Sequence, residues 1–339
     1  MAPKVSVIIP CYNEEATIRL VLKALHKQTY PLEALEVVIV DGMSTDGTRD
    51  EIEAFKREHP ALKTRIVDNP DRHIPHALNR GIAAAQGEII VRLDGHSLPY
   101  PDYIARSVQG IEEGWGANVG GVWEIHPGGE TWIAESIAVA AAHPLGVGDA
   151  KYRYTDTAEE VDTVPFGAFK KKLVDEVGGF DESLLTNEDY EFNARVRAAG
   201  GKIWLDPGIR AIYYARPTFA SLAKQYARYG FWKVRMLRHY PETLRWRQAI
   251  PPLFVLGFIG LGLFSIWFPL AGWIWGLEVV LYSLALIASG LQAMLVKRKL
   301  AHIFGVPLAF IIMHFSWGGA FLWSLLSLVR GTQADVLNG

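Results

Sequence analysis

A long segment almost free of charge constrains this chain more than any other feature. Residues 249–329 carry only four charged side chains, Glu278, Lys297, Arg298 and Lys299. Residues 249–296 contain a single charge, and their length is about twice the ~20 residues that one transmembrane helix needs. A proline and a glycine within residues 268–272 divide this stretch into two spans, and residues 303–329 form a third. We therefore predict about three transmembrane helices in a region covering residues 249–330.

The charge of the remaining chain is unevenly distributed. Residues 1–215 carry 33 acidic and 22 basic side chains, whereas residues 216–248 carry eight basic side chains against Glu242 alone. In residues 216–248 the cations are interleaved with leucine and aromatic residues, as in basic amphipathic helices that lie on a membrane surface. We therefore expect interfacial helices here, with membrane lipid and no nucleic acid as their partner.

The cations also predict an orientation. In a three-span arrangement, Lys297, Arg298 and Lys299 lie on the same side as Arg245 and Arg247, whereas the loop at residues 268–272 has no charge. Basic loops stay in the cytosol. We therefore expect a multi-pass protein of the inner (cytoplasmic) membrane, with residues 1–215 in the cytosol and the C-terminal tail outside.

The first 100 residues alternate short β-branched runs with helical patterns. The predicted strands are 5–9, 37–40, 65–67 and 89–93, the predicted helices are 16–27, 48–58 and 75–85, and later elements are strands 118–123 and 203–205 and a helix at 187–199. This alternation is typical of an α/β domain with a parallel sheet covered on both faces. Ligands bind such sheets beyond the carboxyl ends of the strands, where we therefore look for functional residues.

Polar loops follow the first two predicted strands. The candidate nucleotide-binding residues in them are Pro10, Tyr12, Asn13 and Glu14 in the first loop and Asp41, Ser44 and Asp46 in the second. Neither loop has the glycine pattern of a dinucleotide-binding site or a P-loop. An aromatic ring beside carboxylates suits a nucleotide base and its ribose. Taken singly, Asn13 and Asp46 are explained better by capping of the following helices, whereas the two acidic strand ends taken together favour a nucleotide site.

Asp94 and His96 follow the fourth predicted strand and are separated by Gly95. Residues at i and i+2 of an extended chain point to one face, so the two side chains can converge on one cation. A carboxylate and an imidazole suit Mn²⁺ or Mg²⁺ that also binds a diphosphate. We therefore expect a divalent cation, Mn²⁺ or Mg²⁺, as the cofactor.

Glu188 and Asp189 open the helix predicted at residues 187–199. One explanation is structural, with Asn187 as the N-cap and acidic residues favoured in the first turn by the helix dipole. The other is catalytic, with one carboxylate acting as a general base. The two explanations are compatible, because a helix N-terminus holds a base rigidly.

Six motifs resemble, in order, those of the family 2 glycosyltransferases. They are residues 5–13 (VSVIIPCYN), 41–48 (DGMSTDGT), 77–81 (ALNRG), 94–96 (DGH), 178–181 (GGFD) and 187–189 (NED). The resemblance covers about residues 4–230 and is greatest to the succinoglycan-type exopolysaccharide sugar transferases. It implies a GT-A fold, which is a Rossmann-like mixed sheet, for a cytosolic catalytic domain at residues 1–215. It also implies a nucleotide-diphosphate sugar donor and inversion at the anomeric carbon.

The resemblance assigns roles to residues at matching positions. It implies that Pro10, Tyr12, Glu14, Asp41 and Ser44 contact uridine, that Asp94 and His96 hold the metal and the diphosphate, and that Asp189, beside Glu188, is the catalytic base. Asp41-Gly42 and Asp94-Gly95-His96 depart from the family's usual Asp-Asp and D-x-D. Residues 225–229 (QYARY) depart from the Q-x-x-R-W of processive synthases, which argues against a polymerase.

Four further residues complete the expected nucleotide-sugar site. Asn79 and Arg80 belong to a matching motif. Gly167 either shapes the donor or acceptor pocket or forms a glycine turn between core phenylalanines. Arg228 either neutralises the donor diphosphate or faces lipid phosphate with the other cations of its helix.

We therefore predict an enzyme that transfers one sugar from a UDP-hexose, such as UDP-glucose, to a polyprenyl-diphosphate-linked saccharide in exopolysaccharide or other surface-glycan assembly. Other glycan-assembly enzymes are possible partners. Three alternatives are a transferase that loads polyprenyl phosphate itself, a processive synthase or translocator, and a non-catalytic nucleotide-binding anchor.

Overall fold

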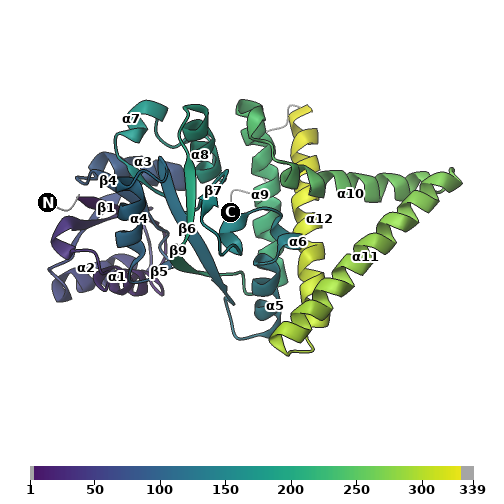
Figure 1. Ribbon diagram of the computed structural model, residues 1–339, viewed down its shortest axis with the longest axis horizontal. Helices are drawn as coiled ribbons and strands as arrows, with labels where there is room; N and C mark the ends of the chain where they lie inside the picture. The colour runs from purple at the N-terminus through teal and green to yellow at the C-terminus, as the bar shows by residue number, and fades with distance from the viewer. Residues whose placement is uncertain (1–3, 330–339) are drawn as a thin grey trace. The chain divides into compact units, whose positions relative to one another are not determined.

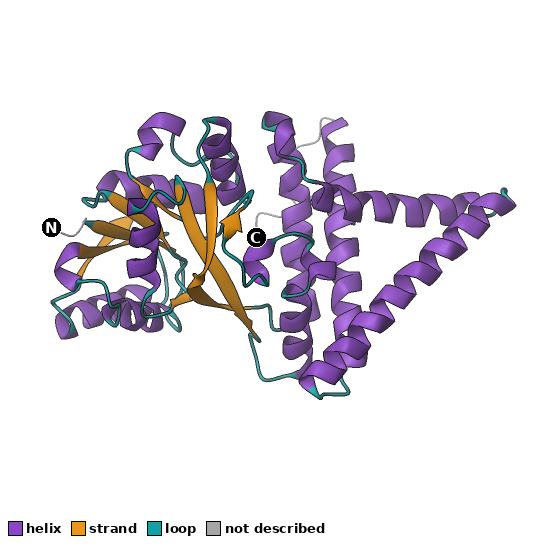
Figure 2. Ribbon diagram, in the orientation of Figure 1, coloured by secondary structure: helices purple, strands orange, loops and turns teal. Residues whose placement is uncertain are grey.

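The computed structural model describes residues 4–329, which form two compact units. The first unit contains the described residues up to Glu124 together with Ala150–Tyr213. The second unit contains Ile125–Asp149 and the described chain from Tyr214 onward. Figures 1 and 2 show the elements of both units.

A mixed sheet forms the centre of the first unit, in the order β3-β2-β1-β4-β8-β6-β9-β5, with β7 paired to β9. Its strands are β1 (Val5–Cys11), β2 (Leu35–Asp41), β3 (Lys63–Asp68), β4 (Ile89–Arg92), β5 (Leu98–Pro99), β6 (Asn118–His126), β7 (Glu159–Glu160), β8 (Ala168–Lys170) and β9 (Ile203–Tyr214). β1 pairs in parallel with β2 and β4, and β2 with β3, whereas β8 runs antiparallel to β4. The predicted α/β domain is therefore confirmed, with a parallel half and an antiparallel half.

Helices cover both faces of this sheet. They are α1 (Ile18–His26), α2 (Thr48–Glu58), α3 (Ile74–Ala84), α4 (Tyr103–Glu112), α7 (Leu173–Val177) and α8 (Glu188–Ala198), with the short 3₁₀ turns η1 (Leu32–Ala34) and η2 (Lys151–Arg153). Alternate residues of one strand enter different cores: Val7 and Ile9 pack with α1, α2 and α4, and Ile8 packs with α3 and α8. This alternation is the period of two expected for a strand that is buried on both faces.

β9 is much longer than the strand predicted at residues 203–205. Asp206, Pro207 and Gly208 have the composition of a turn, and the prediction therefore ended there. In the structure the Asp206 carboxylate accepts hydrogen bonds from the Gly208 N–H (2.8 Å) and from Arg106 (2.9 Å). These contacts hold the segment in the sheet, and they involve a helix about 100 residues earlier in the chain.

The second unit is helical. Its elements are α5 (Trp132–Ala141), α6 (Pro144–Val147), α9 (Phe219–His239), η3 (Pro241–Thr243), α10 (Trp246–Phe264), α11 (Pro269–Lys297) and α12 (His302–Val329). Apolar residues of α5, α9, α11 and α12 share one core. Residues 125–149 therefore belong with this unit, which differs from the single boundary predicted at residue 215. The ten-residue helix α5 is too short to give a membrane signal in the sequence.

Three helices of the described chain are long and apolar enough to cross a membrane: Trp246–Phe264, Pro269–Lys297 and His302–Leu328. They correspond to the spans predicted within residues 249–330, although α10 begins before residue 249 because Trp246, Arg247 and Gln248 form its first turn. Residue 330 and the C-terminal tail, which we predicted to lie outside, are beyond the described residues.

Candidate active site

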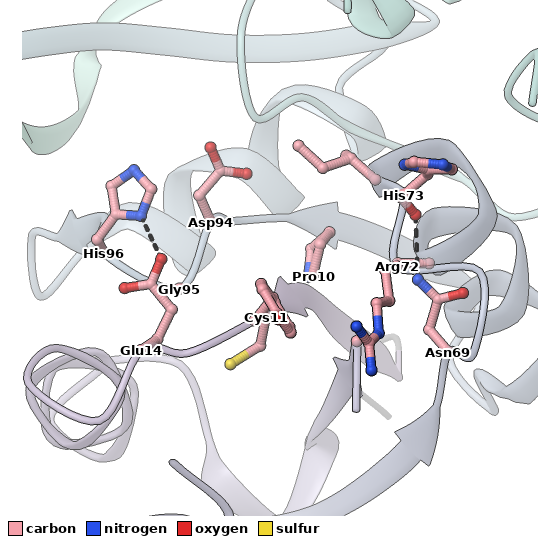
Figure 3. Close-up of a pocket in the computed structure, with 13 residues that line it drawn as sticks. Pro10, Cys11, Glu14, Asn69, Arg72, His73, Asp94, Gly95 and His96 are labelled. Carbon is pink, nitrogen blue, oxygen red and sulfur yellow. Dashed lines mark hydrogen bonds and ion pairs between the residues drawn. The ribbon is translucent and has the colours of Figure 1, made fainter. Parts of the chain in front are cut away.

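A pocket opens at the carboxyl ends of β1, β2, β3 and β4, as the α/β prediction requires. Its lining residues are Pro10, Cys11, Tyr12, Glu14, Gly42, Asn69, Arg72, His73, Ile74, Ala77, Asp94, Gly95 and His96. Figure 3 shows Asp94 and His96 on the same side of this pocket, with Pro10 and Cys11 at its base. Of the predicted residues, Pro10, Tyr12, Glu14, Asp94 and His96 therefore meet in one place.

The loops after β1 and β2 are joined by side-chain hydrogen bonds. The backbone N–H of Asn13 donates to Ser44 Oγ (2.9 Å), and Asn13 Oδ1 accepts from the Thr45 N–H (2.9 Å). Asp46 accepts from the Thr48 N–H (3.1 Å) in the first turn of α2. The capping explanation therefore fits Asp46. It does not fit Asn13, which has a φ of 54° and binds the neighbouring loop instead.

Asp41 is fully buried at the end of β2. Its carboxylate accepts hydrogen bonds from Ser44 Oγ (2.5 Å) and Arg49 Nε (2.6 Å), and Arg49 also pairs with Asp68 (2.6 Å). Neither Asp41 nor Ser44 lines the pocket. Their observed contacts fix the shape of the loop that borders it.

The loop after β3 supplies pocket residues that the sequence analysis missed. Asn69, Arg72 and His73 line the pocket, and the Arg72 guanidinium lies 5.7 Å from the centre of the Tyr12 ring. Tyr12 is 44% exposed, so its ring is available for stacking. Arg72 has a φ of 59°, which is unusual for a residue other than glycine. That backbone conformation directs the loop toward Tyr12. No sequence motif predicts it.

Asp94 and His96 lie after the end of β4 at Arg92, within a turn. Both residues line the pocket, but the chain forms a turn at Gly95 and His96 in place of the extended strand on which the prediction was based. Their convergence on one cation stays a prediction. Glu14 Oε1 lies 2.9 Å from His96 Nδ1. Burial alone would raise the pKa of Glu14, but the hydrogen bond and charge of His96, with a further hydrogen bond from Thr17, hold it below its ordinary value.

This donor set fits a divalent cation that is shared with a diphosphate. A carboxylate at Nδ1 places the ring proton on that nitrogen and the lone pair on Nε2, the arrangement common in metal-ligating histidines. Within residues 4–329 no group of three or more His, Cys, Asp or Glu side chains could hold a metal alone. Phosphate oxygens and water would then complete the coordination shell, as is usual for Mg²⁺.

A buried arginine connects this pocket to the predicted base. The Arg92 side chain is 5% exposed and bonds Asp94 Oδ1 (3.3 Å), Glu188 Oε1 (3.0 Å) and the Asp189 carboxylate. The three carboxylates come from the turn after β4 and from the first turn of α8. One cation among three carboxylates leaves excess negative charge, which a divalent cation would neutralise. Sequence analysis did not select Arg92, although its place at the end of a predicted strand was a usable signal.

Asp189 is the more accessible carboxylate of the acidic pair, with a side chain 26% exposed against 9% for Glu188. Burial raises the pKa of Asp189, the charge of Arg92 lowers it, and the negative charges of Glu188 and Asp94 raise it again. The net effect is a pKa above that of an ordinary aspartate. A raised pKa makes Asp189 a stronger proton acceptor than a solvent-exposed carboxylate.

Asn79, Arg80 and Gly167 make structural contacts. Asn79 donates to the Phe180 carbonyl (2.9 Å) and accepts from the Phe180 N–H (2.8 Å), and Arg80 pairs with Asp71 (2.7 Å). An added Cβ at Gly167 would meet the side chain of Asn118 at 2.0 Å. The Gly167 carbonyl accepts from the Arg92 N–H (3.1 Å), so this glycine allows the close packing that positions Arg92. None of the three lines the pocket.

Arg228 lies in the second unit, exposed on α9. Its predicted contact with a donor diphosphate joins two units and remains a prediction.

Comparison with known proteins identifies relatives along most of the chain. Residues 6–178 match the profile described as Glycosyl transferase family 2. The chain is 29% identical over 316 residues to the dolichyl N-acetyl-alpha-D-glucosaminyl phosphate 3-beta-D-2,3-diacetamido-2,3-dideoxy-beta-D-glucuronosyltransferase of Methanococcus voltae, covering 91% of this chain and 93% of that protein. It is also 29% identical over 329 residues to the succinoglycan biosynthesis protein ExoA of Rhizobium meliloti (strain 1021), covering 96% of each.

Solved structures share the fold. The mannosyltransferase PcManGT from Pyrobaculum calidifontis, in complex with GDP-Man and Mn²⁺, has a TM-score of 0.63 at 21% identity, over 95% of this chain and 88% of that chain. S. aureus TarS 1-349 in complex with UDP has a TM-score of 0.50 at 18% identity, over 99% and 95%. The GT-A fold implied by the motifs is therefore confirmed, and the chain belongs to glycosyl transferase family 2.

Proposed function

We propose that this protein is a membrane-bound, inverting hexosyltransferase that moves a single sugar from a nucleotide-diphosphate sugar to a lipid-linked saccharide. The observation that carries the proposal is the cluster in which Arg92 joins Asp94, in the nucleotide pocket, to Glu188 and Asp189. This cluster places a candidate base close to the group that would bind the donor diphosphate. Inverting transfer of a glycosyl group needs those two elements on opposite sides of the anomeric carbon.

The pocket residues would bind the donor. The Tyr12 ring and Arg72 would contact the nucleotide base, and the loops fixed by Asn13, Ser44 and Asp41 would hold the ribose side of the pocket in shape. Asp94 and His96 would hold Mn²⁺ or Mg²⁺ with the diphosphate. When bound, that ion would neutralise charge developing on the leaving nucleoside diphosphate.

Asp189 would accept the proton of the acceptor hydroxyl as that oxygen attacks the anomeric carbon from the face opposite the leaving group. Attack from the opposite face inverts the configuration. Arg92 would act as a positioning residue, because it contacts Asp189 and Asp94 together and thereby sets the distance between the base and the diphosphate. Glu188 would hold the second side of the guanidinium.

The identity of the substrates rests on the relatives. The Methanococcus voltae relative is named for a dolichyl phosphate-linked sugar and the Rhizobium relative for succinoglycan biosynthesis. The first name favours a lipid-linked acceptor, and the second favours surface-glycan assembly. We propose the cytosolic face of the inner membrane as the location because of the basic loops, with the basic helix α9 in contact with lipid. We propose a UDP-hexose as donor because the motifs resemble those of the succinoglycan-type transferases.

The proposed function is tested by incubating membranes that contain the full chain with UDP- and GDP-hexoses and lipid-linked acceptors, and by weighing the lipid products. We expect a UDP-hexose to add one hexose mass to a polyprenyl-diphosphate saccharide. A product that carries one sugar on a single phosphate would instead identify a polyprenyl-phosphate transferase. A ladder of masses would identify a processive enzyme, and absence of any sugar transfer would contradict the proposal.

The role of Asp189 predicts a specific variant. Asp189→Asn keeps the size of the side chain and an oxygen for Arg92 but removes the proton acceptor. We expect transfer to fall at least about 100-fold, the scale of general-base contributions, with donor binding within about twofold of the unchanged chain. Turnover and nucleotide-sugar affinity are measured separately. Asp175→Asn, an exposed change on α7, is the matched control, and normal turnover by Asp189→Asn would remove this residue as the base.

Chelation tests the cation. EDTA should stop transfer, and added Mn²⁺ or Mg²⁺ should restore it. Asp94→Asn should weaken the metal-dependent part of nucleoside diphosphate binding, measured by calorimetry with and without Mn²⁺, because a neutral amide is a poorer ligand for a hard cation. Full activity in EDTA, or equal nucleotide binding with and without Mn²⁺, would contradict a metal role for Asp94 and His96.

Replacement of Arg92 tests whether its side chain positions Asp189 or only supplies a positive charge. Arg92→Lys keeps one positive charge but cannot contact three carboxylates with a planar fork. We expect its kcat to fall about 10- to 100-fold with little change in donor affinity, because a displaced base costs rate more than binding. Arg92→Met should also unfold at a lower temperature, since buried carboxylates lose their partner, at a cost of about 3–5 kcal/mol. Arg57→Lys, exposed on α2, is the control. An unchanged kcat in Arg92→Lys would exclude the positioning role.

A further inference from the structure

The charged residues of the basic helix α9 indicate which part of the second unit lies at the membrane surface. Its 21 residues include Lys224, Arg228, Lys233, Arg235 and Arg238. A charged side chain at the centre of a bilayer is energetically unfavourable. Lys224, Arg228 and Arg238 are also exposed, as expected for a helix that presents its charges to water and headgroups. α9 therefore lies along the membrane surface and does not cross it.

α12 runs beside α9. The backbones approach closely at Gly230, where an added Cβ would lie 2.2 Å from the Trp317 carbonyl oxygen. Earlier in both helices, Leu222 and Tyr226 of α9 belong to the same apolar core as Phe310 and Met313 of α12. The contacts advance in the same direction along both helices, so the two are parallel neighbours, as Figure 1 also shows. A helix parallel to α9 along several turns shares its orientation to the membrane.

The middle of α12 contacts the short helix α6 and the first turn of α10. His314 Nε2 lies 2.9 Å from the Leu145 carbonyl oxygen in α6, and Trp317 Nε1 donates to the Gln248 carbonyl (3.3 Å). Arg247, next to Gln248, pairs with Asp149 just after α6. Charged side chains are costly at the depth of the hydrocarbon core, so we expect this ion pair near the membrane surface. The midpoint of α12 is therefore at the level where α10 begins.

α5 holds the beginning of α12 at the same surface. Ser136 Oγ lies 3.0 Å from His302 Nδ1, the first residue of α12, and Glu135 pairs with Lys299 (2.6 Å) in the loop before it. The Lys299 and Glu135 side chains are accessible to water, whereas Ser136 and His302 are buried between the two helices. The first turn and the midpoint of α12 therefore lie at one level, although ~18 Å of helix separates them.

α10 and α11, unlike α9, diverge from α12 along much of their length. α10 meets α12 through Pro251 and Val255 near Gly318, but Ile259, Leu263 and Phe264 further along are more than half exposed. α11 contacts α12 from its middle, where the Tyr282 hydroxyl lies 3.0 Å from His314 Nδ1, to Gly290, whereas Leu270 and Trp273 in its first turns are highly exposed. At ~1.5 Å per residue, the 19 residues of α10 span about 28 Å, close to the ~30 Å thickness of the hydrocarbon core. Figure 2 shows this pair as a hairpin that leaves α12.

We propose that only the α10–α11 hairpin crosses the membrane, and that α12 lies in the plane of the lipid surface beneath α9, with the end of α12 on the same side as its beginning. The partner of this surface is the acyl–headgroup boundary of an anionic bilayer. The high hydropathy of α12 then follows from its location, since one side packs on α9 and α5 and residues such as Leu308, Trp323 and Leu326 face lipid. The proposal replaces the three-span arrangement and is independent of the reaction catalysed.

Depth measurements along two helices test this proposal. Leu308→Cys and Leu326→Cys on α12 are 18 residues apart, which is five full turns, so both labels project from one face. Trp273→Cys and Leu291→Cys provide a matched pair with the same spacing on α11. Each single variant carries a depth-sensitive fluorophore in phosphatidylglycerol/phosphatidylethanolamine vesicles, with quenchers at defined depths. The unchanged chain, whose sole cysteine is buried Cys11, gives the labelling background.

We expect the α12 pair to report equal, shallow depths and the α11 pair to differ by up to ~27 Å, the length of 18 helical residues. A depth difference in the α12 pair as large as that in the α11 pair would overturn the proposal. If a labelled variant fails to fold, alkaline phosphatase or green fluorescent protein fused after the last residue of the full chain decides the question. Fluorescence of the green fluorescent protein fusion with an inactive phosphatase fusion supports two membrane crossings. An active phosphatase fusion overturns the proposal.

Discussion

The burial of one positive charge, that of Arg92, organises the candidate active site. A guanidinium removed from water must be compensated, and here Asp94, Glu188 and Asp189 supply the compensation from segments nearly 100 residues apart. β4 delivers the arginine to the edge of the sheet, and the N-terminus of α8 delivers two of the acids. The candidate metal site and the candidate base are therefore linked, because Asp94 and Asp189 are both partners of the same buried cation.

The sequence predicted where the candidate site lies better than it predicted what each polar residue there contacts. Buried β-branched runs identify strands by elementary periodicity, and parallel strands then bring Tyr12, Glu14, Asp94 and His96 to one edge. Whether a polar side chain at that edge faces a ligand or the protein depends on distant partners. Asn79 binds the backbone of Phe180, and Asp41 binds Arg49, so both are satisfied within the protein. No local pattern encodes these pairings, nor the backbone conformation that brings Arg72 to Tyr12.

The same limit applies to the membrane region. Hydropathy identified α10, α11 and α12 because it measures whether a segment can leave water. It does not measure depth, which depends on what the helix packs against. One side of α12 is apolar because it contacts α9, and another side is apolar because it would contact lipid. The mean hydropathy along the sequence cannot separate these two causes. The contacts of His314 with α6 and of Trp317 with the first turn of α10 are the observations on which the proposed depth of α12 rests.

Both units accommodate charge by pairing it with opposite charge, by hydrogen bonds or by leaving it exposed to water. In the first unit a cation is buried and three carboxylates surround it, which leaves negative charge beside the pocket where a divalent ion and a diphosphate would bind. In the second unit Lys224, Arg228 and Arg238 of α9 are exposed, whereas Lys233 is buried and donates to the Thr243 carbonyl. Arg247 at the start of α10 pairs with Asp149. In the arrangement proposed above, this ion pair marks the point at which the chain enters the bilayer, and α12 contacts that point at its middle and extends along the membrane surface on either side of it.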